Sequence, residues 1–192
     1  MKATADLWEE HKAVLHMLTV LEGLVARMGR GETPSADDLQ KVVEFLRVFV
    51  DLCHHGKEEQ LLFPALREVA DADTQRLIDR LLDEHEEGRA HVAALAAVAG
   101  FAPADGPAVQ TAPACRPGEE AEYAMNGYIA LLRPHIAAEQ LTLFPTADKI
   151  LPAEVQEELE RGFALVEEEV IGPGRHAAFE ALLHELKERY VD

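Results

Sequence analysis

Apolar residues recur three and four positions apart along almost the whole chain, and strand-like alternation is nearly absent. The first apolar stripe predicts a helix over about residues 4–29 and consists of Leu7, His11, Val14, Leu15, Leu18, Leu21 and Val25. A Gly/Pro-rich break follows, after which Ser35 is placed to cap the next helix. The pattern therefore predicts an all-α protein.

The helical pattern continues to the end of the chain. It predicts helices over about 36–70, 74–99, 119–149 and 152–170, and a last short helix that ends near Tyr190. Residues 100–118 contain four prolines and little periodicity, which is typical of a loop. Pro134 lies inside the fourth long helix and predicts a kink beside His135.

Four long helices with turns between them indicate an up-down-up-down four-helix bundle. We expect residues 1–150 to form this bundle and residues 151–192 to form a C-terminal helical extension packed on it. The hydrophobic content of 48% is sufficient for a core. The extension is acidic and is expected to cover the bundle; a lid over a site and a homodimer interface are the alternatives, so monomer and homodimer both remain open.

Charge and cysteine content narrow the class of protein. With 36 acidic against 18 basic residues, the formal net charge is −18, which argues against nucleic acid and anionic membranes as partners. No apolar run approaches the roughly 20 residues of a membrane span, and the N-terminus shows no signal peptide. Cys53 and Cys115 form no disulfide framework. We therefore expect a cytoplasmic protein.

One motif occurs in both halves of the chain. His-x-x-x-Glu-x-x-x-x-Phe-Pro starts at His54 and again at His135. Residues i and i+4 lie on one face of a helix, so each copy directs an imidazole and a carboxylate to the same point. The carboxylate is Glu58 in the first copy and Glu139 in the second. Two such pairs facing each other predict a site for two metal ions.

The repeat extends upstream, because a Glu-His pair at residues 10–11 returns at residues 84–85. Counted from the predicted turns at about 1.5 Å per residue, six groups fall into one layer of the bundle: His11, His54, Glu58, His85, His135 and Glu139. Buried carboxylates need a cation. Imidazole and carboxylate donors without a thiolate suit iron or manganese, with zinc as a further option.

The first copy of the motif contains a second pair at the same spacing, His55 and Glu59. Counting back from Phe-Pro, as in the second copy, selects His54 and Glu58 as the site residues. His55 and Glu59 then lie about 100° round an α-helix and are expected beside the site or in solvent. No nucleophile–base pair or nucleotide fingerprint appears, so we assign no catalytic residue.

The order His, His-x-x-x-Glu, His, His-x-x-x-Glu, with Leu-Phe-Pro after each Glu, resembles the hemerythrin-like HHE cation-binding domain over about residues 5–150. The resemblance implies two iron ions (Fe2+/Fe3+), with an oxo or hydroxo bridge as an option, held by the six groups, and Glu58 and Glu139 as bridging ligands. It implies binding of a small diatomic or peroxide ligand, in oxygen, nitric oxide or redox sensing or in iron handling. A di-iron enzyme acting on peroxide or oxygen is the alternative.

One position departs from the oxygen-carrying members of that family. They carry a second histidine four residues after the first on the third helix, where this chain has Arg89. A guanidinium cannot become a ligand, so the ion near His85 is short of one nitrogen. The candidate replacements are His55, then His91 or a residue of the C-terminal extension. Alternatively, the open position and the guanidinium favour anion or peroxide chemistry.

Overall fold

The computed structural model describes residues 4–101, 117–172 and 174–191. Within these ranges the chain is helical and contains no strand, which confirms the all-α prediction. The helices are, in chain order, α1 (Thr4–Gly29), α2 (Ala36–Glu44), η1 (Phe45–His55), η2 (Glu58–Leu62), α3 (Phe63–Arg67), α4 (Ala72–Val98), α5 (Pro117–Ala138), η3 (Glu139–Leu143), α6 (Phe144–Ile150), α7 (Ala153–Val170) and α8 (Arg175–Tyr190).

The helix boundaries follow the predicted breaks. The Ser35 hydroxyl accepts a hydrogen bond from the backbone N–H of Asp38 at 3.0 Å, which confirms the predicted cap of α2. Asp71 caps α4 in the same way through the N–H of Thr74, at 2.9 Å. Most of the predicted loop over 100–118, with Cys115, lies outside the described residues.

The segments η1, η2 and η3 are π-helical turns inside two long helical runs, α2–α3 and α5–α6. Two of these turns directly precede the Phe-Pro of the repeated motif, at Pro64 and Pro145. A proline ring clashes with the carbonyl four residues before it and removes one hydrogen bond. A wider turn relieves this clash, and such turns are frequent at functional sites. The run containing Pro134 stays α-helical past that residue, and the irregular turn begins at Glu139 instead.

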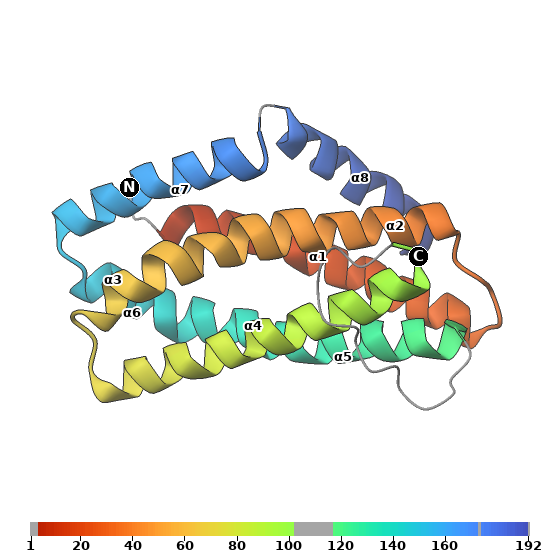
Figure 1. Cartoon of the computed structure of the whole chain (residues 1–192), viewed down its shortest axis with the longest axis horizontal. Coiled ribbons are helices and arrows are strands. Elements are labelled where there is room, and N and C mark those ends of the chain that lie inside the picture. Colours follow the sequence, from red (N-terminus) through yellow and green to blue (C-terminus); the bar gives the residue numbers. More distant parts are fainter. Residues whose placement is uncertain (1–3, 102–116, 173, 192) are drawn as a thin grey trace.

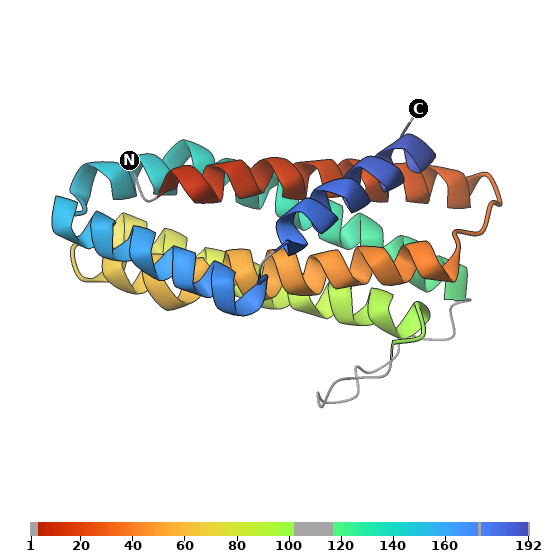
Figure 2. The same ribbon diagram turned by 90° about the horizontal axis from the view of Figure 1, so that it is seen from above.

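The four longest helical stretches lie side by side, as Figures 1 and 2 show for α1, the α2–α3 run, α4 and the α5–α6 run. α5 contacts both α1 and α4, and α4 also contacts η1. Two apolar clusters fill the interior. The larger includes Val14, Cys53, Val92 and Ile136, and the smaller includes Leu7, Leu62, Leu81 and Leu143. On every long helix the predicted site residues fall between members of these two clusters, so a polar layer divides the core.

The C-terminal segment packs on the outside of these helices: α7 contacts η1 and η2, and α8 lies across α1 (Figure 2). Both contacts are close. A side chain at Gly162 of α7 would meet Leu61, and one at Gly23 of α1 would meet the backbone of Tyr190. The buried carboxylate of Asp38 binds Arg189 and the Tyr190 hydroxyl, which fixes the end of α8. No described helix is long and apolar enough to cross a membrane.

Candidate metal centre

All six predicted site residues lie in the polar layer, and the side chain of each is at least 97% buried. Together with His55 they form two groups whose donor atoms lie within 4.8 Å of one another. We call them the first cluster (His11, His54, Glu58, Glu139) and the second cluster (His55, Glu58, His85, His135). Glu58 belongs to both.

The two carboxylates stand between the imidazoles of the two clusters. Glu58 Oε1 lies 3.7 Å from His54 Nε2, and Glu58 Oε2 lies 3.5 Å from His85 Nε2. Glu139 Oε2 lies 3.2 Å from His11 Nε2, and Glu139 Oε1 lies 3.2 Å from His135 Nε2. Each carboxylate therefore offers one oxygen to each cluster, which is the arrangement that bridges two cations.

Three of the imidazoles are oriented by a further carboxylate. His54 Nδ1 donates to Glu10 at 2.8 Å, and His135 Nδ1 donates to Glu84 at 2.8 Å. His85 Nδ1 donates to Glu59 at 2.7 Å. A proton on Nδ1 leaves the Nε2 lone pair of each ring free, as ligation of a metal requires.

Of these supporting carboxylates, Glu59 was expected beside the site or in solvent, whereas Glu10 and Glu84 were not assigned from the sequence. Two of them had a signal, since each half places a Glu immediately before its first histidine, at Glu10 and Glu84. In each half that Glu binds the histidine of the His-x-x-x-Glu motif on the next long helix. Glu59 had no such signal, because the second copy of the motif has Gln140 at the same position.

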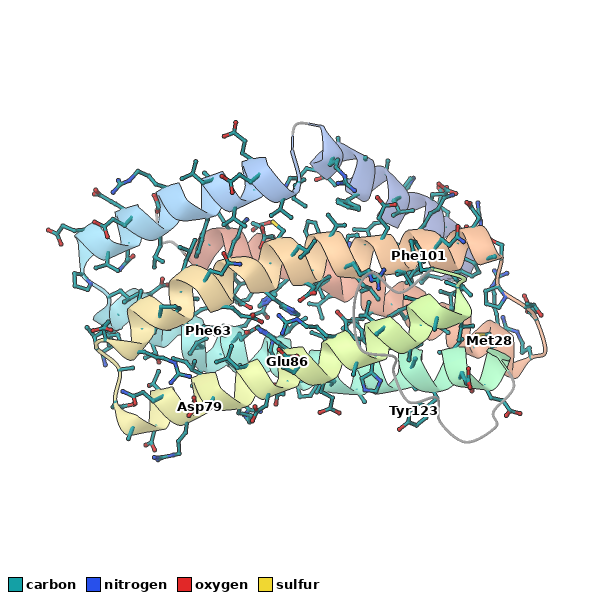
Figure 3. The ribbon with its side chains drawn as sticks, viewed as in Figure 1. Met28, Phe63, Asp79, Glu86, Phe101 and Tyr123 are labelled. Carbon is teal, nitrogen blue, oxygen red and sulfur yellow. The ribbon has the colours of Figure 1, made fainter. Side chains whose placement is uncertain are left out.

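The repeated Phe-Pro also has a role in the site. Phe144 stacks on His11 with ring centroids 5.3 Å apart, and Phe63 stacks on His85 at 5.9 Å. Each motif thus packs its phenyl ring on an imidazole of the other half. Figure 3 shows nitrogen and oxygen atoms gathered between the helices near the labelled Phe63 and Glu86.

Arg89 is bound by carboxylates rather than open to a ligand. Its guanidinium donates to Asp51 at 2.7 Å, to Glu59 at 2.5 Å and to Glu86 at 2.9 Å. Asp51 in turn lies 3.7 Å from His55 Nδ1. These contacts weaken the idea that Arg89 captures an anion. Instead, Arg89 holds Glu59, which binds His85, and Asp51, which lies beside His55.

His55 takes the place that the sequence left open. Its ring stacks on His85 with centroids 3.8 Å apart and is buried in the second cluster. In the π-helical turn of η1 successive side chains diverge less than in an α-helix, so His54 and His55 both face the core. His91 instead lies against Gly127, and neither it nor any described residue after 150 joins the clusters.

The electrostatics are those of a site that needs cations. Burial, followed by the charge of Glu139, raises the pKa of Glu58 well above its ordinary value. Burial alone would lower the pKa of His135, but Glu139 and Glu84 raise it to about 9. Burial and the neighbouring His85 lower the pKa of His55. Without a metal, protons must therefore occupy part of this site.

The donor atoms fit a metal. Both ring nitrogens of His55 and both carboxylate oxygens of Glu58 are buried and lack a hydrogen-bond partner among the described residues. His85 Nε2 and His135 Nε2 face each other at 3.2 Å, where two lone pairs repel unless a proton or a cation lies between them. Buried, unsatisfied donors are costly, and cations at the two clusters would satisfy them.

Comparison with known proteins agrees with this geometry. Residues 2–147 match the hemerythrin HHE cation-binding domain. The chain belongs to that family. The six predicted site residues of this HHE domain all lie within the matched range.

The chain is also similar to uncharacterized proteins of Mycobacterium bovis and Mycobacterium tuberculosis. With each it is 26% identical over 152 residues, which cover 79% of this chain and 55% of the relative. The chain thus spans about half the length of the curated relatives it matches. No solved structure gives a significant match.

Proposed function

We propose that this HHE domain binds two iron ions, one in each cluster, with Glu58 and Glu139 as bridging ligands. The observation that carries the proposal is the pair of four-residue clusters that share Glu58. One cluster offers two imidazoles and two carboxylates, and the other offers three imidazoles and one carboxylate. This donor set, with no thiolate, suits iron or manganese, with zinc as a further option.

We propose further that α1 and α4 and the two long runs form the up-down-up-down four-helix bundle expected of residues 1–150, with residues 151–192 as its extension. The contacts of α5 with α1 and α4 support this topology. The bundle holds the candidate ligands in one layer on rigid helices. The two-iron site would bind a diatomic gas or peroxide, and the protein would use this binding in the cytoplasm for sensing or for iron handling.

Iron reconstitution tests the proposal. Metal-free protein is loaded with ferrous iron without oxygen, desalted, and assayed for iron per chain. We expect about two ions per chain, and a visible band that changes on addition of oxygen, nitric oxide or peroxide. Uptake of a single zinc ion with no iron would contradict the proposal.

An oxygen- or peroxide-dependent oxidoreductase is the second candidate. The first cluster contains two histidines and two carboxylates. It therefore includes the two-histidine, one-carboxylate donor set of non-haem iron oxygenases that keep positions open for a substrate. When bound, iron would supply the redox chemistry, and the apolar clusters on either side of the layer would exclude water. Steady turnover of peroxide by the iron-loaded protein would favour this candidate over sensing.

A further inference from the structure

A chain of polar contacts connects the C-terminal extension with the metal centre. It starts at His54, whose Nδ1 donates to Glu10 Oε2 at 2.8 Å. The other Glu10 oxygen lies 2.5 Å from the ammonium of Lys57, and that ammonium also donates to Glu167 Oε2 of α7 at 3.3 Å. Glu167 Oε1 lies 2.8 Å from His176 Nε2 of α8.

Lys57 and Glu10, in the middle of this series of contacts, are buried and therefore depend on their charged partners. The Lys57 side chain is 1% exposed and that of Glu10 is 7% exposed, whereas that of Glu167 is 41% exposed. A buried ammonium needs anionic partners. Lys57 and His54 both donate hydrogen bonds to the carboxylate of Glu10, so they compete for its negative charge. Glu167 supplies the second anion that Lys57 requires.

We propose that Glu167 is a positioning residue for the metal centre and acts through Lys57 and Glu10 on His54. The inference rests on the proposed metal function. The partner of a ligating imidazole fixes the orientation of the ring and its strength as a donor. Because Glu167 also accepts a hydrogen bond from the Lys57 ammonium, Glu10 is not the only anion that compensates this charge. Glu10 therefore remains a strong acceptor for His54. The extension is thereby part of the site although none of its described residues joins either cluster.

The second half of the repeat has no equivalent. Three residues after His135 stands Ala138, at the position of Lys57 in the first copy. The carboxylate that orients His135 is Glu84, which pairs with the exposed Arg80 of its own helix at 3.0 Å. Among the residues that the structure describes, the polar contacts of the extension therefore reach only the histidine of the first half.

Three successive glutamates on α7 allow a matched test in the full chain. Glu167→Gln, Glu168→Gln and Glu169→Gln remove the same charge from the same helix. The dissociation constant of Co2+ is measured by competition with a chelator, and the ring nitrogens of His54 are followed by NMR in metal-free protein. We expect Glu167→Gln to weaken Co2+ binding about three- to tenfold and to shift the His54 signals. We expect less than about a twofold change in the other two variants. Equal effects in all three would overturn the inference.

A double-mutant cycle checks the route. If Glu167 acts through Lys57, Glu167→Gln has no further effect in a Lys57→Met background; an independent, additive effect would overturn the inference. Should Lys57→Met fail to fold, the comparison of the three glutamates still decides. If the parent protein binds no metal, the proposed function fails, while unchanged His54 signals in metal-free Glu167→Gln would separately disprove the contact chain.

Discussion

The two halves of the molecule carry the same motif but support it differently. In the first half, His54 binds Glu10, and Glu10 is buried against Lys57. In the second half, His135 binds Glu84, whose side chain is 18% exposed and pairs with a surface arginine. The motif places the candidate ligands symmetrically, whereas the residues around it make the two halves unequal.

The donor sets differ for the same reason. After its motif histidine the first copy has His55, which joins the second cluster, whereas the second copy has the buried apolar residue Ile136. The first copy thus offers three donors and the second offers two. If the clusters hold one ion each, the second ion depends on a residue that the repeat does not contain.

The largest expected effect concerns the carboxylate that both clusters share. Glu58→Gln keeps the shape of the side chain but removes its charge from both clusters, so we expect loss of both ions. Glu139→Gln is the matched comparison. Its two oxygens also face one imidazole of each cluster, but by donor geometry it groups with the first cluster alone, so we expect a smaller loss that leaves at least one ion. Metal content after reconstitution and desalting measures both. Two ions retained in Glu58→Gln would break the assignment.

His55→Gln tests the asymmetry of the donor sets. Because it removes a nitrogen from the second cluster alone, we expect about one ion per chain instead of about two. His91→Gln is the control from outside the clusters and should retain the metal content of the parent. About two ions per chain in His55→Gln would show that His55 is not needed as a ligand and that the six residues of the repeat are sufficient.

Removal of the supporting carboxylates sharpens the comparison of the halves. We expect Glu10→Gln to weaken metal binding about 10- to 100-fold. Glu84→Gln should cost less than about tenfold, because water can replace a partly exposed acceptor. In metal-free protein Glu10→Gln also leaves Lys57 buried without its closest anion, which should lower the free energy of unfolding by about 3–5 kcal/mol. Chelator competition and urea denaturation measure the two effects; equal losses would remove the distinction.

The two halves should also respond to opposite ends of the pH range in metal-free protein. Burial by itself would raise the pKa of Glu10, but His54 and Lys57 lower this pKa from 4.5 to about 2. The stabilisation that the ionised Glu10 provides is therefore lost as the pH falls from 4.5 to 2. The pKa of His135 is raised from 6.5 to about 9, so its stabilisation is lost as the pH rises over that interval. Each contribution is about 3 kcal/mol.

Denaturation at a series of pH values measures these losses. Glu10→Gln should lack the acid loss, and His135→Gln should lack the alkaline loss. Bound metal should remove the alkaline loss from the parent protein, because a ligating imidazole has already given up its proton. An alkaline loss that persists in His135→Gln would assign it to another group.

The smallest effect is expected at Arg80, the surface partner of Glu84. The side chain of Arg80 is 51% exposed, so Arg80→Ala should lower the free energy of unfolding by less than about 1 kcal/mol. Metal affinity should change less than about twofold. Urea denaturation of Arg80→Ala beside Lys57→Met compares the surface pair with the buried one. A loss at Arg80 as large as that at Lys57 would contradict the difference between the halves.

The sequence by itself determined the helical segments, the Ser35 cap and the level of the six predicted site residues. These are local properties: apolar periodicity defines a helix, and a fixed rise per residue sets the height of each side chain. The duplication also decided between the two possible pairs in the first copy. The spacing to Phe-Pro at His135 is the same as at His54, which selects His54 and Glu58.

Only the tertiary structure decided which groups meet across helices. The pairing of Glu10 with His54, the entry of His55 into the second cluster and the contact of Glu167 with Lys57 depend on how each helix is rotated about its axis. The π-helical turns change that rotation. Of these turns, η2 and η3 directly precede the Phe-Pro of the motif, whereas η1 has no neighbouring proline. Spacing along one helix fixes height and face, but packing between helices decides the partner.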